Sequence, residues 1–413
     1  MVASTDIKFY LHTNTNAPQL QNAFGSMINV LDACLVNGFG ARSVSTLMAS
    51  GTIATATFST AHNYMKYQVI KISDAEQAEF NGEHRILSIP NANTITFELS
   101  TTASVTSATG SITCSLPSLG WEKPFGAGGK AAYRSTNTLL SSRPYLRVID
   151  ELDPSYTSTF AKYAKVGIVE DMSDIDTMLG VQAPYTSSAP NRNWVGTGSG
   201  VSASNGWSKW YYASTVDSTI TTADSDGSNA GNRNWILVGN KDYFYILPAV
   251  VSANTWALTY GFGSFKTLLN TDTSNTFLSS TYYYSAANST YQKSTYTGIS
   301  GSGASNIALL QRSYSQTATP RDSLTVSLGN VEVSSGYSNY FGAYSLTNIA
   351  PFAPVFLKES VLRGELFGFY WLFQARPYNN YQLIEKNNSL YIAVNAGVGF
   401  SLQGQVVLKI GDL

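Results

Sequence analysis

The stretch from residue 120 to residue 149 decides the fold. It reads Gly-Trp-Glu-Lys-Pro-Phe at 120–125, Gly-Ala-Gly-Gly-Lys-Ala-Ala-Tyr-Arg-Ser at 126–135 and Arg-Pro-Tyr-Leu-Arg-Val-Ile at 143–149. Its two halves are short segments of aromatic and β-branched residues, and a loop rich in Ser, Thr and Asn joins them. This pattern predicts a hairpin at the centre of an all-β domain.

The composition indicates a folded protein with a weakly charged surface. Charged residues make up 12% of the 413 residues, about half of the typical share of ~25%, and the formal net charge is -1. Aromatic residues reach 13%, which is too many for a disordered chain. Because such a surface has a weak long-range field, we expect no binding to nucleic acid or to anionic lipid. It suits a protein in a permanent assembly, or one that meets sugars.

Cysteine usage and the chain ends point to a protein made in a cytoplasm. Cys34 and Cys114 fall in a predicted helix and a predicted strand, so we expect buried free thiols rather than a disulfide. Met1–Asp6 is polar and does not resemble a signal peptide. Leu366–Phe373 is too short for a membrane span, so we expect no membrane insertion.

The first 42 residues predict a strand and one convincing helix that belong to the main domain. Ile7–Leu11 is the strand, Asn16 caps the helix, Pro18 lies in its first turn, and Asn37-Gly38 ends it. Apolar residues at steps of three and four share one helix face: Leu20, Phe24, Met27, Ile28, Leu31 and Leu35. That face must pack on a sheet or on a neighbouring subunit, because the helix is too short to be stable alone.

Residues 43–117 predict a small β-barrel-like module inserted into the main domain. The expected strands are Thr52–Phe58, Tyr67–Ile72, Arg85–Ile89, Thr94–Leu99 and Ile112–Leu116. Asn81-Gly82 is a strong turn signal, and five or so short strands in about seventy residues are typical of a small barrel or a half-open sandwich.

Residues 118–413 predict a main domain that is an antiparallel β-sandwich, with two subdomains if the chain divides near residues 270–320. Expected strands are Lys165–Val169, Trp235–Val238 paired with Tyr243–Leu247, Trp256–Phe262, Ser323–Leu328, Leu366–Ala375, Leu390–Val394 and Gln405–Ile410. Long polar loops separate them at Ser187–Gly206, Thr221–Gly231 and Ser285–Ser305. Loops of this length are usually functional or held by partners.

No local motif predicts a catalytic residue, a cofactor or a metal site. The glycine-rich segment 126–131 differs from a phosphate-binding loop, because Pro124 stands at the first glycine position and Ala131 replaces the magnesium-binding Ser or Thr. Two carboxylate clusters lack the remaining features of a calcium loop: Asp171, Asp174 and Asp176, and Asp224, Asp226 and Asn229. The three histidines are His12, His62 and His84. They have no zinc-binding spacing, and we expect the last two at the surface or in turns.

Aromatic residues in polar loops are the candidate contact residues. They are Trp194, Trp207, Trp210, Tyr211, Tyr282, Tyr283 and Tyr284. Consecutive residues of a strand face opposite sides, so at least one of the three adjacent tyrosines should be exposed or at an interface. Such rings are enriched at protein contacts and can also stack on sugars, and we favour subunit contact.

Several segments together resemble a known family. They are Ile7-Lys-Phe-Tyr10, Asn37-Gly-Phe-Gly40, Gly120-Trp-Glu-Lys-Pro-Phe125, Lys130-Ala-Ala-Tyr-Arg-Ser135, Tyr145-Leu-Arg-Val-Ile-Asp150, Asn234-Trp-Ile-Leu-Val-Gly-Asn240, Tyr243-Phe-Tyr-Ile246 and Tyr260-Gly-Phe-Gly-Ser-Phe265. Up to about residue 270 the chain resembles structural proteins of tailed bacteriophages, usually placed among tail or baseplate components. The turn at Phe80-Asn-Gly82 resembles those of small β modules in phage tail proteins.

The resemblance implies a virion protein that works by assembly and not by catalysis. These motifs are structural, so no active-site residue is carried over. Where such proteins often have an acidic Gly-Asp, this chain has Gly263-Ser264, so the resemblance does not carry over any role tied to that acid. Implied partners are other tail or baseplate proteins and further copies of the chain, assembled in the host cytoplasm. The alternatives are a head, neck or collar decoration protein, a receptor module that binds host-surface glycan, and a tailspike enzyme that degrades polysaccharide.

Overall fold

A computed structural model describes residues 3–199, 204–214, 227–252, 256–282, 307–316, 325–329, 351–372, 376–397 and 403–413. Within these residues the fold is mostly antiparallel β, with one helical segment of substantial length near the N-terminus, as the sequence predicts. None of the helices in the described ranges has the length and apolar character needed to cross a membrane.

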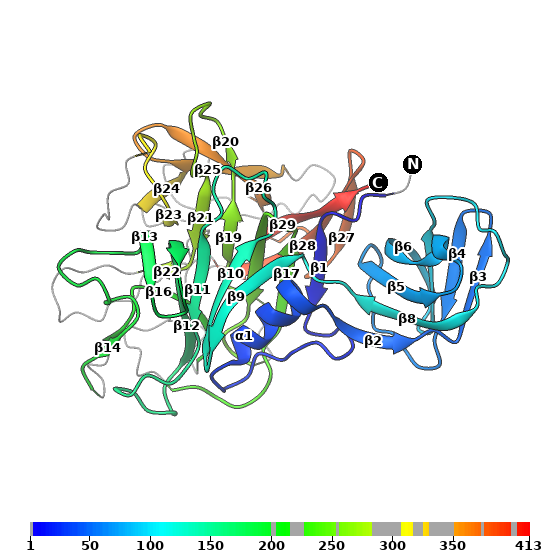
Figure 1. Cartoon of the computed structure of the whole chain (residues 1–413), viewed down its shortest axis with the longest axis horizontal. Coiled ribbons are helices and arrows are strands. Elements are labelled where there is room, and N and C mark those ends of the chain that lie inside the picture. The colour runs from blue at the N-terminus through cyan, green and yellow to red at the C-terminus, as the bar shows by residue number, and fades with distance from the viewer. Residues whose placement is uncertain are drawn as a thin grey trace.

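The largest sheet runs through both ends of the chain and curls into a half-barrel (Figure 1). Its strands are β1 (Lys8–Leu11), β17 (Trp235–Gly239), β18 (Tyr243–Pro248), β19 (Tyr260–Ser264), β20 (Lys266–Thr267), β21 (Thr276–Ser279), β23 (Ile307–Leu310), β24 (Thr325–Gly329), β25 (Ala353–Lys358), β26 (Leu362–Leu372), β27 (Leu383–Lys386), β28 (Ser389–Gly397) and β29 (Gln403–Asp412). The predicted pairing of β17 with β18 is confirmed. The curl brings β1 into contact with β29, although strand pairing places them far apart in the sheet.

A second sheet packs on the first and carries the stretch quoted at the outset. Its strands are β9 (Trp121–Ala127), β10 (Lys130–Ser135), β11 (Tyr145–Ile149), β12 (Lys162–Met172), β13 (Met178–Ala183), β16 (Ser208–Ala213) and β22 (Thr281–Tyr282). The stretch forms three strands rather than one hairpin, because Gly128 adopts a φ of 59° and closes a tight turn between β9 and β10. These strands lie toward one edge of the sheet and not at its centre, with β9 outermost.

A third sheet consists entirely of strands from residues 39–116 and projects from the rest of the molecule (Figure 1, right). Its strands are β2 (Phe39–Ser43), β3 (Thr46–Ser50), β4 (Ile53–Thr57), β5 (Val69–Ala75), β6 (Gly82–Asn91), β7 (Thr94–Glu98) and β8 (Gly110–Leu116). We call this sheet with its loops the projecting module, and the remainder the body. The Asn81-Gly82 signal is part of a wider turn, because Ala78–Phe80 forms a short 3-10 helix before it.

The two faces of the curled sheet bury separate cores. Trp235 and Leu237 of β17 point toward the second sheet and the helix, while Ile236 and Val238 point into the half-barrel. Both sets are at most 1% exposed. The central strands of the body are therefore covered on both faces, as in a sandwich.

The helix begins later than the sequence predicts. It runs as α1 (Ser26–Leu31) and continues as one π-helical turn over Asp32–Asn37, ending at Gly38 as expected. Asn16 adopts a φ of 57° and is not the cap. The predicted apolar face is otherwise confirmed, because four of its residues are buried in the body core with at most 8% exposure: Met27, Ile28, Leu31 and Leu35.

A distant aspartate takes the place of a local cap. Asp150, directly after β11, is 1% exposed, and its Oδ2 accepts hydrogen bonds from the backbone N–H groups of Met27 at 2.9 Å and Ile28 at 3.4 Å. Tyr212 Oη lies 2.5 Å from Asp150 Oδ1. Burial raises the pKa of Asp150 to about 6, although these hydrogen bonds oppose the shift. The signal for the helix start lies about 120 residues away, which hides it from local sequence patterns.

The cysteines confirm the sequence prediction, whereas two histidines contradict it. Cys34 and Cys114 are both free and buried. His62 and His84 are 2% and 7% exposed, so the expectation of surface positions is wrong. His62 Nδ1 accepts the backbone N–H of Tyr64 at 3.0 Å, and burial lowers the pKa of both imidazoles.

Candidate functional site

The candidate site is a cavity of about 300 Å³ on the outer face of the second sheet. Strands β10, β11 and β12 form its floor. Strand pairing places Ile149 between Lys130 on β10 and Lys165 on β12. Two residues earlier on β11, Arg147 is paired with Gly167. Side chains alternate between the faces of a sheet, so these residues share the face opposite the body core.

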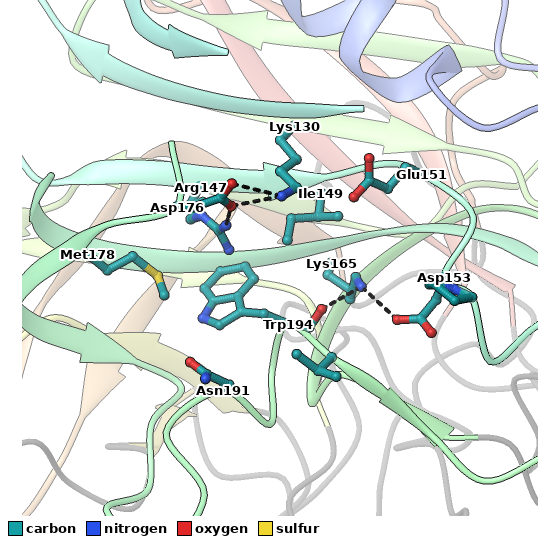
Figure 2. Close-up of a pocket in the computed structure, with 12 residues that line it drawn as sticks. Lys130, Arg147, Ile149, Glu151, Asp153, Lys165, Asp176, Met178, Asn191 and Trp194 are labelled. Carbon is teal, nitrogen blue, oxygen red and sulfur yellow. Dashed lines mark hydrogen bonds and ion pairs between the residues drawn. The ribbon is translucent and has the colours of Figure 1, made fainter. Parts of the chain in front are cut away.

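Six charged side chains line the cavity, and Figure 2 shows how they converge. They are Lys130, Arg147, Lys165, Glu151, Asp153 and Asp176. Three of them are at most 8% exposed: Arg147, Asp153 and Lys165. Charged groups are rarely buried unless they are paired, because desolvation costs several kcal/mol per ion. The cavity therefore depends on its internal ion pairs.

Arg147 and Lys130 converge on one carboxylate. Arg147 Nη2 lies 2.9 Å from Asp176 Oδ1, and Lys130 Nζ lies 2.8 Å and 3.0 Å from the two carboxylate oxygens. Arg147 Nε also donates to the carbonyl oxygen of Ile175 at 2.9 Å. The two cations lower the pKa of Asp176, and Lys130 has the larger effect. Asp176 is thus held ionised and bound on both sides.

Lys165 forms the second ion pair, deeper in the cavity. Its Nζ donates to the carbonyl oxygen of Trp194 at 2.6 Å and lies 3.6 Å from Asp153 Oδ2. Asp153 Oδ2 also accepts the backbone N–H of Gly196 at 2.8 Å. Burial lowers the pKa of Lys165 to about 8, and the nearby carboxylate opposes that shift.

Trp194 forms one wall of the cavity, and Gly167, which has no side chain, leaves room for the indole ring. A Cβ atom at Gly167 would lie 2.6 Å from the indole Cη2, so no larger residue fits there without movement. The Arg147 guanidinium lies 4.6 Å from the indole centroid, a cation–π contact. Trp194 is 6% exposed, and its Nε1 has no hydrogen-bond partner within the part of the chain that the structure describes. The same holds there for Arg147 Nη1, which belongs to the guanidinium above the ring.

The loop that carries Trp194 is anchored to the floor by a buried amide. Asn193 is 1% exposed; its Nδ2 donates to the carbonyl oxygen of Val166 at 2.9 Å, and its Oδ1 accepts the backbone N–H groups of Trp207 and Ser208, each at 2.9 Å. The segment around Asn193 is therefore tied to β12 on one side and to the start of β16 on the other. Trp194 and Asn191 of this segment line the cavity, and a functional or partner-bound role for the long loops stays a prediction.

Glu151 forms the rim, against the glycine turn of the quoted stretch. A Cβ atom at Gly129 would lie 2.5 Å from Glu151 Cβ and 2.8 Å from the carbonyl oxygen of Asp150, so Gly129 permits this close approach. The Glu151 carboxylate makes no hydrogen bond within the described ranges; burial lowers the pKa of Arg147 and Lys165, and the charge of Glu151 is among the causes that oppose this shift. The glycine-rich segment thus positions a carboxylate, which is a role that sequence reasoning missed.

The predicted contact aromatics do not lie on exposed loops. Trp207, Trp210 and Tyr211 are 8%, 0% and 1% exposed and belong to the body core, and Tyr282 is 4% exposed on β22. Trp210 Nε1 donates to the carbonyl oxygen of Ser279 at 2.8 Å. Tyr283 and Tyr284 lie outside the described residues. Trp194 is the member of the set that lines the cavity, and contact of these rings with a partner or ligand stays a prediction.

The two acidic clusters have different outcomes. Asp176 belongs to the cavity, while Asp174 Oδ1 accepts the backbone N–H groups of Asp176 and Thr177, each at 2.9 Å, and so closes a turn. Asp171 is exposed. Asp224 and Asp226 lie outside the described residues, and the carbonyl oxygen of Asn229 accepts from Arg233 Nη2 at 2.5 Å.

Sequence reasoning missed most of the cavity, although one signal was present. Arg147 and Lys165 are cations inside otherwise apolar strands, Tyr145–Ile149 and Lys162–Met172. A cation in such a segment must find a buried partner or line a cavity. The partners Asp153 and Asp176 lie in loops, and no local spacing links them to the strands.

Comparisons with known proteins leave the family open. No protein-family profile matches the chain, and no curated protein matches it in sequence. Among solved structures, one that matches is "Phage phi92 endosialidase", with 9% sequence identity and a TM-score of 0.17. The match covers 90% of this chain and 52% of that protein, so this chain spans about half of its length. A TM-score this low supports no inference about fold or activity.

Proposed function

We propose that this chain is a structural component of a tailed bacteriophage particle, located in the tail tip or baseplate, and that it acts by assembling with its neighbours. The segments in the first 270 residues that resemble phage tail proteins suggest the particle. The low charge and the β architecture are compatible with a permanent assembly. The partners would be other tail or baseplate proteins and further copies of this chain.

The observation that carries this proposal is the firm attachment of the projecting module to the body. Gln68 of the module is fully buried; its Nε2 donates to the carbonyl oxygen of Phe9 at 3.0 Å and to Asn14 Oδ1 at 2.9 Å. Its Oε1 accepts from Asn14 Nδ2 at 3.0 Å. A buried, fully paired amide of this kind fixes one orientation, because any rotation would leave its polar atoms unpaired.

A buried arginine reinforces the attachment of the projecting module to the body, which we call the joint. Arg85 is 3% exposed; its Nε and Nη2 donate to the carbonyl oxygens of Ser4 at 2.7 Å and Ile7 at 3.0 Å, and its Nη1 donates to that of Tyr67 at 2.7 Å. The Lys8 and Glu83 side chains form an ion pair at 3.1 Å across the same joint. When the module and the body are held rigidly together, they present their surfaces at a fixed angle, which a symmetric ring or spike requires.

Imaging of the particle tests the proposal directly. A cryo-electron microscopy map of the phage that encodes the chain should contain several copies, related by the symmetry of the tail and located at its distal end. Density at the head, neck or collar would support the decoration alternative instead. Absence of the chain from purified particles would reject a structural role.

The joint can be tested in the same particles. Arg85→Ala leaves three backbone carbonyl groups without their donor, so it should loosen the module and reduce incorporation into particles, measured by mass spectrometry. Arg42→Ala is the matched control, because Arg42 donates only within the module, to Thr60 and Ala61. Equal incorporation of both variants would contradict the idea that the fixed joint matters for assembly.

The proposal also holds that the chain works without turnover. Purified protein incubated with host-surface polysaccharide should release no reducing ends above the background. Steady release that disappears when one carboxylate is mutated would replace the structural role with that of a tailspike enzyme.

A further inference from the structure

We infer that the cavity on the outer face of the second sheet binds an uncharged, hydroxyl-rich ligand, with the chemistry of a neutral sugar unit. This inference goes beyond the assembly role and does not depend on it, since the cavity lies on the body, in strands and loops apart from the joint with the projecting module.

The charge of the cavity favours a neutral ligand. The three cations Lys130, Arg147 and Lys165 are matched by three carboxylates, so the formal charge of the lining is zero. The Asp176 and Asp153 pairs hold their cations at hydrogen-bond or ion-pair distance, as described above. An anionic ligand would be desolvated without gaining a free counter-charge, because all three cations are already paired, and this costs free energy. An uncharged ligand avoids this penalty.

Among the charged and aromatic side chains that line the cavity, one acceptor and two donors have no hydrogen-bond partner within the described residues. Glu151 offers a carboxylate that makes no hydrogen bond within the described ranges, and the buried Trp194 Nε1 and Arg147 Nη1 have no acceptor there. Hydroxyl groups of one ligand can donate to the carboxylate and accept from the two N–H groups, directly or through bound water. A ligand carboxylate could only accept and would face the like charge of Glu151, whereas a ligand ammonium could only donate and would leave both donors unsatisfied.

The shape and the walls of the cavity suit a sugar ring. A volume of about 300 Å³ is at the lower end of small-molecule sites, roughly 300–1,000 Å³. Ile149, Met178 and Trp194 supply apolar surface for the C–H groups of such a ring, and the charged groups stand around them (Figure 2). Gly129 and Gly167 make the space for Glu151 and Trp194, so the two groups are held in place by the fold itself.

Binding of defined sugars tests this inference. The full chain would be screened on an array of neutral mono- and oligosaccharides, with hexuronic acids and short peptides as competing classes, and hits would be titrated by calorimetry. Glu151→Ala and Trp194→Phe should each weaken binding of a neutral sugar at least about tenfold. Trp194→Phe keeps a ring against Gly167 and removes only the N–H donor and part of the surface.

Matched controls separate binding from folding. Glu98→Gln changes a half-buried carboxylate in the projecting module, and Trp256→Phe changes a buried indole elsewhere in the body; both should bind the sugar like the unchanged protein. Thermal unfolding of each variant shows whether its fold is kept.

Three results would overturn the inference. They are no binding of any neutral sugar, equal binding by the unchanged protein and both cavity variants, and binding confined to acidic sugars or peptides. None of these results bears on incorporation into particles, so failure here and failure of the assembly role are distinguishable.

Discussion

The strands of the projecting module and the central strands of the body bury their side chains in different patterns. In the module, exposure alternates along β7, and on β5 the exposed Lys71 stands between the fully buried Ile70 and Ile72. In the body, every residue of β17 and β18 is buried. Buried module residues such as Ile72 and Phe97 belong to one cluster, which continues into the body, whereas alternate side chains of β17 and β18 enter two different clusters. The same secondary structure therefore tolerates substitution very differently in the two regions.

The largest expected effect comes from the core between the two sheets of the body. Trp210 is fully buried, lies 5.9 Å from the Tyr260 ring and donates to the carbonyl oxygen of Ser279. Trp210→Ala should lower the free energy of unfolding by about 3–5 kcal/mol, measured by urea denaturation. If Trp210 were instead an exposed ring at an interface, the Trp210→Ala monomer would have the same free energy of unfolding as the unchanged protein. Tyr314→Ala, at a ring that is 45% exposed, is the control.

Consecutive substitutions test the two-core arrangement itself. Ile236→Ala and Leu237→Ala point to opposite faces of β17, and each should cost about 2–5 kcal/mol of unfolding free energy. In the module, Ile72→Ala should cost as much, because its side chain is fully buried. If one of the two β17 variants were as stable as the unchanged protein, one face of that strand would not bury a core.

Asp150 should make the free energy of unfolding depend on pH. Its folded pKa of about 6 lies above the value of 3.8 for an unperturbed aspartate, so its contribution to stability is fully present below about pH 3.8 and is lost as the pH rises through about 6. The loss amounts to at most about 3 kcal/mol. Asp150→Asn mimics the neutral form and should remove this component.

The measurement is the difference in unfolding free energy between the unchanged protein and Asp150→Asn from pH 4 to pH 7. This difference should move in favour of the variant as the pH rises. Asp74→Asn, at an exposed aspartate of the module, provides the control. A difference that stays constant with pH would show that Asp150 is ionised throughout this range.

The smallest effect is expected on the outer face of the module. Lys71→Ala removes an exposed side chain next to the buried Ile72, and it should change the unfolding free energy by no more than about 0.5 kcal/mol. The difference in unfolding free energy between Lys71→Ala and Ile72→Ala measures how strongly burial differs between the two faces of the module sheet. A loss above about 2 kcal/mol would place Lys71 in a contact that the isolated chain does not show.

The same contrast explains which parts of the fold follow from sequence. Alternation along β4 and β7 is local, so these strands were predicted almost to the residue. In β12, by contrast, only Lys165–Val169 was predicted of the eleven residues in Lys162–Met172, because its lysines interrupt the apolar pattern and their partners lie in loops. The helix start was misplaced because its cap, Asp150, is distant in sequence. The domain boundaries at residues 43 and 117 stay a prediction.

The candidate site was less predictable than the fold for a related reason. Trp194 was named from composition alone, as an aromatic ring among polar residues. The cavity around it comes from the register of β10, β11 and β12, which places Arg147 beside Gly167 and Lys165 beside Ile149. Register depends on turn geometry and on the buried face of the whole sheet, and a single sequence does not display either.

The pairing of β1 with β17 sets an order of events during synthesis. Lys8 stands opposite Gly239, so the first strand must wait until about 230 further residues have left the ribosome, which takes roughly 10–50 s at 5–20 residues per second. The module strands lie within residues 39–116 and can pair long before then. We therefore expect ribosome-bound chains arrested near residue 150 to hold a protease-resistant module and an accessible N-terminus. Cleavage throughout residues 39–116 in those chains would show that the module needs the finished body.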